Sequence, residues 1–224
     1  MIKENIKYGT FFFKIYSYYH LYIKEKFYIE RSTYSQSGED IFIKKFFKNK
    51  KKGSYVDIGA FHPIRHSNTQ LLYNIGWNGI NIDLNPASID FFNIVRKRDK
   101  NIHAAISSKN YKTKVYLNSF FDTTNSIVKK KFDEWNANSS EKKIFYIETK
   151  TFNQIINNPF DFLNIDIEGS DLEVIQSINL NDYNPSLICI EILDNQEEKE
   201  FFKYFKDFKY NLIDKIGKSF FFKK

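Results

Sequence analysis

Acidic side chains follow several short apolar runs of the sequence, where strands of a sheet are expected to end. Asp57 and Asp83 end two such runs. Asp166 and Glu168 follow a third run, and Glu191 lies in a fourth. In an open α/β sheet, ligands bind outside the carboxyl ends of the strands. Helix capping or solvation would explain any one carboxylate, but the set would repel itself without a ligand or cation. The pattern favours a binding site at this edge.

The turn at residues 57–60 differs from the dinucleotide-binding fingerprint. That fingerprint has the form Gly-x-Gly-x-x-Gly. Here Phe61 and Ile64 stand where its second and third glycines belong. A nucleoside without a diphosphate fits better, because Gly59 permits close approach of the backbone. Asp83 lies about 20 residues further on, where a ribose-binding acid is expected.

The later acids allow two ways of removing a proton from an acceptor hydroxyl. Asp166, Glu168 and Glu191 could supply oxygen ligands for Mg²⁺ or another divalent cation. Such a cation would lower the pKa of a bound hydroxyl and hold it in place. Without a metal, Asp166 or Glu168 would act as the general base, with His62 or His66 as the other candidates. The residues alone leave both versions open.

Short apolar runs alternate with helical stretches from Ser54 onward, which predicts a mostly parallel sheet with helices on both faces. The predicted strands are residues 54–58, 79–84, 101–106, 112–117, 145–151, 162–167 and 187–192, with a closing antiparallel pair at 208–213 and 219–222. The predicted helices are residues 69–75, 86–96, 172–178 and 196–205. Residues 118–143 are rich in Ser, Thr, Asn and Lys, and are interpreted as a long loop or insertion.

The composition is that of one folded domain. The 224 residues are 42% hydrophobic, which excludes a disordered chain. The single cysteine, Cys189, excludes an internal disulfide framework and a cysteine-based metal cluster, and suits a reducing compartment. The net charge of +7 is carried almost entirely by lysine, and by itself it indicates a solvated surface. We therefore expect a cytoplasmic protein.

Residues 1–33 are interpreted as an aromatic and basic helical extension. An apolar run at 11–23 is interrupted by Lys14 and His20. It therefore lacks the roughly 18 uninterrupted apolar residues that a membrane-spanning helix needs. No small-residue cleavage site follows it. A helix that covers the flank of the domain is the favoured interpretation, and a helix resting on an anionic membrane is the alternative.

An ordered series of short motifs runs from Tyr34 to Ile192. The motifs are YSQSGED at 34–40, VDIGA at 56–60, SNT at 67–69, GWNGINID at 76–83, NP at 85–86, AIS at 105–107, DIEG at 166–169 with an acid at 171, and IEI at 190–192. Each motif alone is common, but the ordered series is specific, and it resembles the FkbM family of S-adenosylmethionine-dependent methyltransferases. Residues 1–33 and 118–143 lie outside the resemblance.

The resemblance implies an α/β class I methyltransferase (Rossmann-like) fold, with a seven-stranded, mostly parallel sheet, a final antiparallel strand and helices on both faces. It implies one methyltransferase domain over residues 34–224. Residues 57–60 would line the methionine part of S-adenosylmethionine, Asp83 the ribose, and residues 105–106 the adenine. Phe61-His62-Pro63 departs from the glycine-rich turn of many methyltransferases. The implied cofactor-binding residues are Ser35, Gln36, Asp57, Gly59, Ala60, His62, Ser67, Asn68, Asp83, Leu84, Ala105, Ile106 and Asp166.

We expect an O-methyltransferase that acts on a hydroxyl of a sugar or glycan precursor, with Asp166, Glu168 and His62 as catalytic candidates. The expected acceptors are a sugar, a nucleotide-sugar or a lipid-linked glycan, and DNA is not an expected partner. The need for a divalent cation, a peripheral membrane contact and a homo-oligomer are open alternatives. A non-catalytic module of the same fold is a further alternative, which the intact acidic series disfavours.

An RNA methyltransferase is a competing interpretation, because a lysine cluster precedes the first predicted strand. That cluster is expected at the end of the strand opposite the cofactor edge, which weakens the RNA interpretation. Its members are Lys44, Lys45, Lys48, Lys50, Lys51 and Lys52.

Overall fold

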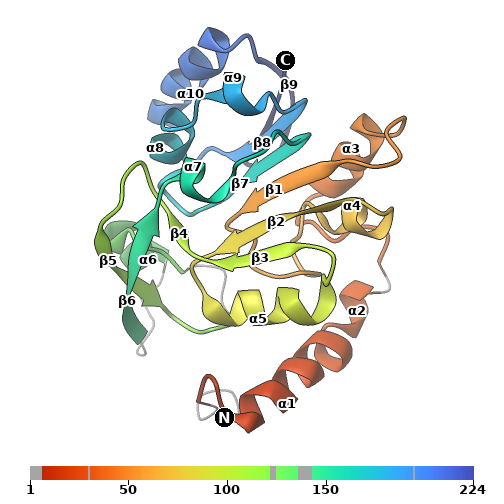
Figure 1. Cartoon of the computed structure of the whole chain (residues 1–224), viewed down its shortest axis with the longest axis vertical. Helices are drawn as coiled ribbons and strands as arrows, with labels where there is room; N and C mark the ends of the chain where they lie inside the picture. Colours follow the sequence, from red (N-terminus) through yellow and green to blue (C-terminus); the bar gives the residue numbers. More distant parts are fainter. Residues whose placement is uncertain (1–6, 30, 122–124, 136–142, 194) are drawn as a thin grey trace.

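The computed structural model describes residues 7–29, 31–121, 125–135, 143–193 and 195–224. Within these residues, a seven-stranded sheet has the order β3-β2-β1-β7-β8-β10-β9 (Figure 1). The pairs from β3 through β8 are parallel, and β10 is antiparallel to both of its neighbours. This confirms the predicted mostly parallel sheet with an antiparallel closing strand. The strands are β1 (Ser54–Ile58), β2 (Asn78–Asp83), β3 (Lys100–His103), β7 (Phe162–Ile165), β8 (Leu187–Glu191), β9 (Asn211–Ile216) and β10 (Ser219–Lys223).

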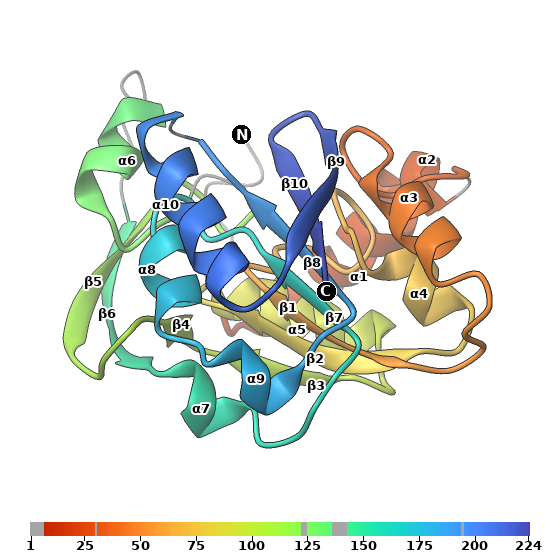
Figure 2. The same ribbon diagram turned by 90° about the horizontal axis from the view of Figure 1, so that it is seen from above.

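Alternating side chains of the central strands build two hydrophobic cores, one on each face of the sheet. Tyr55 packs with α3 (Glu39–Phe46) and α4 (Gln70–Asn74). The next residue, Val56, packs with α8 (Asp171–Gln176) and α10 (Asn195–Asp207). Figure 2 shows α3 and α4 on one side of the sheet and α8 and α10 on the other. The predicted helices on both faces are confirmed.

Helix α5 (Pro86–Val95) begins immediately after β2, because its first turn is capped by local residues. The Asn85 side chain accepts a hydrogen bond from the backbone N–H of Ala87, and Pro86 occupies the first turn. Proline suits this position, since its missing N–H would have no partner inside the helix. Helix α5 therefore begins three residues after the last residue of β2. The short helices α7 (Phe152–Ile155) and α9 (Leu180–Tyr183) complete the domain.

A small second sheet corrects two expectations from the sequence. The run predicted as one strand at 101–106 divides after His103, and β4 (Ala105–Ile106) joins β6 (Lys143–Lys150) and β5 (Lys112–Leu117). The segment predicted as a loop at 118–143 contains helix α6 (Lys129–Trp135). Within that segment, residues 122–124 and 136–142 lie outside the described part of the chain. Local composition did not reveal α6, which forms where Phe132 is buried.

The N-terminal residues form three consecutive helical segments, α1 (Phe11–Tyr19), the π-helical η2 (His20–Lys24) and α2 (Lys26–Ile29). The hydroxyl of Thr10 caps α1 by accepting from the N–H of Phe13. The His20 ring stacks on Phe91 of α5, with ring centroids 5.5 Å apart. One side of the extension therefore packs against the domain. No helix in the described part of the chain is long and apolar enough to cross a bilayer.

Candidate active site

A cavity opens at the carboxyl ends of β1, β2, β4 and β7. Together with the solvent-filled space at its mouth, it encloses about 920 Å³. This is the edge of the sheet that the sequence predicted. The predicted cofactor residues on its wall are Gln36, Asp57, Gly59, Ala60, Asn68, Asp83, Leu84, Ala105, Ile106 and Asp166, and Glu168 lines it as well.

Gly59 allows the ends of β1 and β7 to meet at the cavity wall. Its φ is +77°, and a Cβ atom added here would lie 1.7 Å from the carbonyl oxygen of Asp166. The N–H groups of Gly59 and Ala60 both donate to the carbonyl of Ile82 on β2, at 2.9 and 3.1 Å. Only glycine can occupy this position without moving the backbone. The close neighbour of Gly59 in the structure is thus the β7 end of the chain itself.

Asp57 is a buried carboxylate held by hydrogen bonds from two other elements. Its Oδ2 accepts from the Thr69 hydroxyl at 2.7 Å, and its Oδ1 accepts from the Asn164 amide at 2.8 Å. Asn68 Nδ2 donates in turn to Asn164 Oδ1 at 3.0 Å. Burial raises the pKa of Asp57. Asn164 was missed by the sequence analysis, although a polar residue inside the buried run FLNI is a detectable signal.

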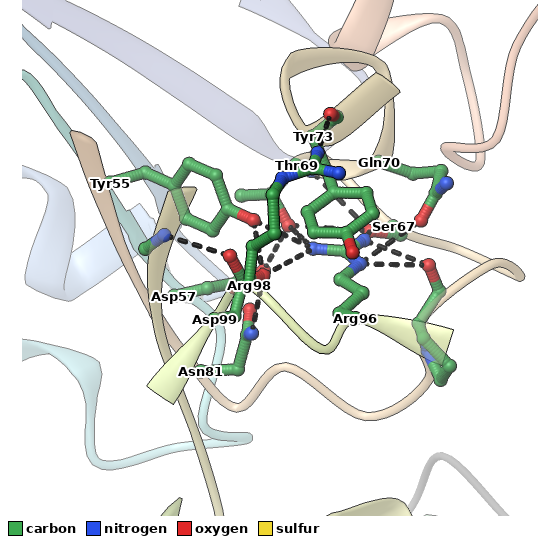
Figure 3. Close-up of polar contacts among 12 residues, drawn as sticks. Tyr55, Asp57, Ser67, Thr69, Gln70, Tyr73, Asn81, Arg96, Arg98 and Asp99 are labelled. Atoms are coloured by element: carbon green, nitrogen blue, oxygen red, sulfur yellow. Dashed lines mark hydrogen bonds and ion pairs between the residues drawn. The ribbon is translucent and has the colours of Figure 1, made fainter. Parts of the chain in front are cut away.

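A fully buried arginine, Arg96, donates hydrogen bonds to several residues around Asp57 (Figure 3). The Arg96 guanidinium donates to the hydroxyls of Thr69 at 2.7 Å and Ser67 at 2.6 Å. It also donates to the carbonyl of Pro63 at 2.8 Å and to Gln70 Oε1 at 3.0 Å. Ser67 is therefore occupied by Arg96 and does not line the cavity, contrary to the expected cofactor contact. No local pattern in the sequence indicated this role for Arg96.

Asp83 ends β2 as a buried carboxylate that shapes the neighbouring turns. Its Oδ2 accepts from the N–H of Phe61 at 2.8 Å, and its Oδ1 accepts from the N–H of Asn85 at 2.7 Å. Burial raises the pKa of Asp83 to about 6. Each oxygen makes one such bond and retains a further acceptor site. Beside it, the apolar residues 105–106 line the wall, so this end of the cavity fits a nucleoside with ribose hydroxyls to donate.

Asp166, Glu168 and Glu191 bring one carboxylate oxygen each to within 4.8 Å of one another. Asp166 and Glu168 line the cavity, whereas Glu191 stands behind them at the end of β8. Burial and the negative charges of Glu191 and Glu168 raise the pKa of Asp166 well above its ordinary value. Burial, followed by the charge of Asp171, raises the pKa of Glu191 to about 7. Three carboxylates in this arrangement would bind a proton or a cation.

The backbone of the turn after β7 is held in an unusual shape. Glu168 has a φ of +59°, a region that residues other than glycine seldom adopt and that often marks functional sites. Both oxygens of Asp171 accept backbone N–H groups from this turn, Ile167 at 3.0 Å and Gly169 at 3.1 Å. Asp171 therefore holds the backbone on both sides of Glu168 in place. The sequence singled out Asp171 only as part of a motif.

His62, like Ser67, lies away from the cavity wall. His62 is buried between His20 and Phe91, and its Nδ1 accepts from the N–H of Arg65 at 3.0 Å. Burial and the neighbouring charges of His20 and Arg65 lower the pKa of His62 well below its ordinary value. The position contradicts the expectation of His62 as a base or cofactor contact, because its ring packs on the N-terminal extension. His66 lines the cavity instead.

The Ser35 side chain also makes hydrogen bonds within its own turn. Its hydroxyl donates to Asp40 at 2.8 Å and accepts from the N–H of Gly38 at 3.1 Å. It does not line the cavity, contrary to the expected cofactor contact, but it fixes the turn from which Gln36 reaches the wall.

The lysine cluster of the alternative RNA interpretation lies in a different part of the molecule, as expected from its place before β1. A shallow hollow on α3 and the loop before β1 is lined by Lys44, Lys45, Lys48, Lys50 and Lys51. Strand β1 begins at this end and finishes at the cavity, so the two features lie at opposite ends of one strand.

Comparison with known proteins gives a family and a fold. The methyltransferase FkbM domain matches residues 57–215. No curated protein matches the chain. Among solved structures, methyltransferase FkbM from Methylobacillus flagellatus KT is similar, with 14% identity, a TM-score of 0.54, and coverage of 93% of this chain and 53% of that one. The chain therefore spans about half the length of that relative.

A TehB-like SAM-dependent methyltransferase from Corynebacterium glutamicum ATCC 13032 Kitasato is also similar, at 10% identity and a TM-score of 0.50, with coverage of 94% of this chain and 99% of that one. These likenesses confirm the class I methyltransferase fold. Because the domain match covers more than half of the sequence, the chain belongs to the FkbM family of S-adenosylmethionine-dependent methyltransferases.

Proposed function

We propose that this chain transfers a methyl group from S-adenosylmethionine to a hydroxyl of a sugar or glycan precursor, and that a divalent cation assists. The observation that carries this proposal is the group of three carboxylates, Asp166, Glu168 and Glu191, gathered within 4.8 Å beside the cavity. Oxygen-rich groups of this kind are ligands for Mg²⁺ and similar hard cations.

The cavity wall fits the proposed methyl donor. Asp83 would accept hydrogen bonds from the ribose, and residues 105–106 offer an apolar surface for the adenine. Gly59 and Asp57 would face the methionine part, at the end of the cavity nearer Asp166. S-adenosylmethionine supplies an electrophilic methyl group when bound. The residues of the chain must then orient the acceptor oxygen and remove its proton.

The carboxylates are suited to that second task. A sugar hydroxyl is a poor nucleophile at neutral pH, so it needs a base or a cation. The raised pKa of Asp166 makes its carboxylate a stronger base than an ordinary aspartate. A cation held by Asp166, Glu168 and Glu191 would relieve their repulsion and lower the pKa of a bound hydroxyl.

A transfer assay with labelled S-adenosylmethionine tests the proposal on the full chain. The acceptors are a panel of sugars, nucleotide-sugars and lipid-linked glycans, with RNA as a separate arm, each with Mg²⁺ and with EDTA. Binding of S-adenosylhomocysteine is measured in parallel by calorimetry. We expect the product analogue to bind under both conditions, and transfer to a sugar to require the cation.

Asp166→Asn separates chemistry from cofactor binding. We expect this variant to bind S-adenosylhomocysteine and to lose turnover, whereas the exposed control Asp214→Asn retains both. Full turnover by Asp166→Asn would remove Asp166 from the mechanism. Transfer to RNA alone would replace the sugar acceptor, and absence of S-adenosylhomocysteine binding would overturn the methyltransferase function.

A further inference from the structure

The N-terminal helices carry an apolar face that is exposed within the described part of the chain. One side of the extension, with Phe13 and Leu21, is buried against the domain. The opposite side is exposed, and its side chains recur at the three- and four-residue spacing of a single helix face. Phe11 and Phe12 are each 73% exposed. This exposed aromatic face consists of Phe11, Phe12, Ile15, Tyr18, Tyr19, Tyr22, Ile23 and Phe27.

The exposed aromatic face is exceptional within the described residues. Its eight members are more than half of the fifteen large apolar side chains that are exposed there. Monomeric proteins seldom expose contiguous apolar patches of this kind unless the patch binds something. Burial of the opposite side shows that the helices are already docked, so refolding onto the domain would not cover this face.

Basic side chains outnumber acidic ones in this part of the sequence, with six Lys and Arg against three Glu in residues 1–33. The described residues 7–29 and 31 carry exposed basic side chains, whereas their single acidic residue, Glu25, is buried. Glu25 lies 3.6 Å from the Arg65 guanidinium, so its charge is directed into the domain. An aromatic face beside an excess of basic side chains is complementary to a surface that is apolar inside and negative outside. The basic side chains are Lys7, Lys14, Lys24, Lys26 and Arg31.

We propose that the exposed aromatic face rests on an anionic membrane surface. The aromatic rings would enter the boundary between headgroups and acyl chains, and the long basic side chains would reach the lipid phosphates. A second copy of this chain is a poorer occupant, because a self-complementary contact would bring the two sets of basic side chains together. The proposal does not depend on the acceptor or on the metal.

The membrane contact would lie on the same structural unit as the cavity wall. The ring of Phe13 stacks against Phe121, with centroids 6.1 Å apart. The preceding carbonyl, of Phe120, accepts a hydrogen bond from Asn85 at 2.9 Å. The same segment after β5 supplies Asn125 to the wall. The extension and the cavity wall are thus joined by direct contacts.

Co-sedimentation of the full chain with lipid vesicles tests this inference. One set of vesicles is phosphatidylcholine alone, and the other contains phosphatidylglycerol as well. We expect binding to the anionic vesicles, weak binding to the neutral ones, and release by salt. Phe11→Ser with Phe12→Ser should weaken the partition coefficient at least about tenfold, since two large apolar groups are lost. Lys14→Gln should weaken it about fivefold.

Ile144→Ser with Tyr146→Ser is the matched control. These two β6 side chains are 53% and 60% exposed on another part of the molecule, and we expect unchanged vesicle binding. Thermal unfolding and S-adenosylhomocysteine binding verify that every variant is folded. Failure to bind anionic vesicles, or equal losses in the control and N-terminal variants, would overturn the proposal. A dimer in sedimentation velocity that the N-terminal variant dissociates, without vesicle binding by the wild type, would replace the membrane by a second copy.

Discussion

Gly59 and Asp166 approach so closely that a Cβ atom on residue 59 would lie 1.7 Å from the Asp166 carbonyl oxygen. This contact ties the turn that carries Asp57 to the turn that carries Glu168. The two turns come from neighbouring parallel strands, β1 and β7. The nucleoside end and the acidic end of the cavity are therefore held in one rigid arrangement, whose stability depends on a residue without a side chain.

Gly59→Ala should disrupt this arrangement. The added methyl group must displace backbone and also adopt a positive φ, so we expect the free energy of unfolding to fall by at least about 3 kcal/mol. S-adenosylhomocysteine binding should be lost in calorimetry. Gly76→Ala is the matched control, because Gly76 also has a positive φ of +98° but nothing within 4 Å of an added Cβ. Its loss should be only about 1 kcal/mol. Equal losses would show that the φ angle alone matters.

Arg96→Lys should weaken both the fold and the cofactor site. Lysine keeps the charge but cannot reproduce the planar set of donors to Ser67, Thr69 and Gln70. We expect a loss of about 3 kcal/mol in chemical denaturation, and weaker S-adenosylhomocysteine binding because Thr69 no longer steadies Asp57. The exposed Arg98→Lys is the control, with a change within about 0.5 kcal/mol. Wild-type stability of the Arg96 variant would contradict a supporting role for the network.

Asp171 should make stability fall as the pH rises from about 4 to 6. Burial raises its pKa in the folded protein from 3.8 to about 6. The folded state therefore binds more protons than the unfolded state between these values, and this contribution is lost as the pH rises. At 1.36 kcal/mol per pKa unit, it amounts to at most about 3 kcal/mol.

The contribution of Asp171 is isolated by measuring the free energy of unfolding against pH for the wild type and for Asp171→Asn. Relative to wild type, the variant should gain stability from pH 4 to pH 7, because asparagine has no charge to bury. Parallel pH curves would show that Asp171 titrates normally.

Cation binding at the proposed site should strengthen as the pH rises. Burial and the charge of Asp171 hold the pKa of Glu191 near 7. A cation must displace the proton that this carboxylate binds below that pH. We expect Mn²⁺ affinity to increase by up to about tenfold per pH unit between pH 6 and 7, and calorimetry in two buffers of different ionisation enthalpy to detect proton release. A pH-independent affinity would exclude Glu191 as a ligand.

Asp83→Ala should remove cofactor binding without removing the acidic cluster. Asp83 accepts from the N–H groups of Phe61 and Asn85 and offers its remaining acceptor sites to a ribose. We expect S-adenosylhomocysteine affinity to fall at least about tenfold, the effect of one lost charge-assisted hydrogen bond. Mn²⁺ binding, measured separately, should persist. Unchanged affinity for S-adenosylhomocysteine would exclude Asp83 as the ribose acceptor.

The pattern of apolar runs and acids was enough to predict the parallel sheet and the edge where its polar groups gather. Strands with consecutive apolar residues must be buried on both faces, and acids placed after several of them must meet where parallel strands end. Asp57, Asp83 and Asp166 therefore could be placed near one cavity before the fold was known. The start of the helix at Pro86 was also predictable, since it depends on local backbone geometry.

Tertiary structure alone decided which polar groups meet across the chain. Asn164 donates to Asp57, 107 positions away in sequence, because β1 and β7 are neighbours in the sheet. His62 stands near the glycine turn in sequence, yet its ring packs against His20 of the extension. Likewise, both sides of the N-terminal helices are apolar in sequence. The side that is buried is the one whose Phe13 and His20 rings contact Phe121 and Phe91 of the domain. Local patterns determine the backbone conformation and which face of a strand is apolar. Contacts between distant side chains depend instead on which strands and helices become neighbours in the folded protein.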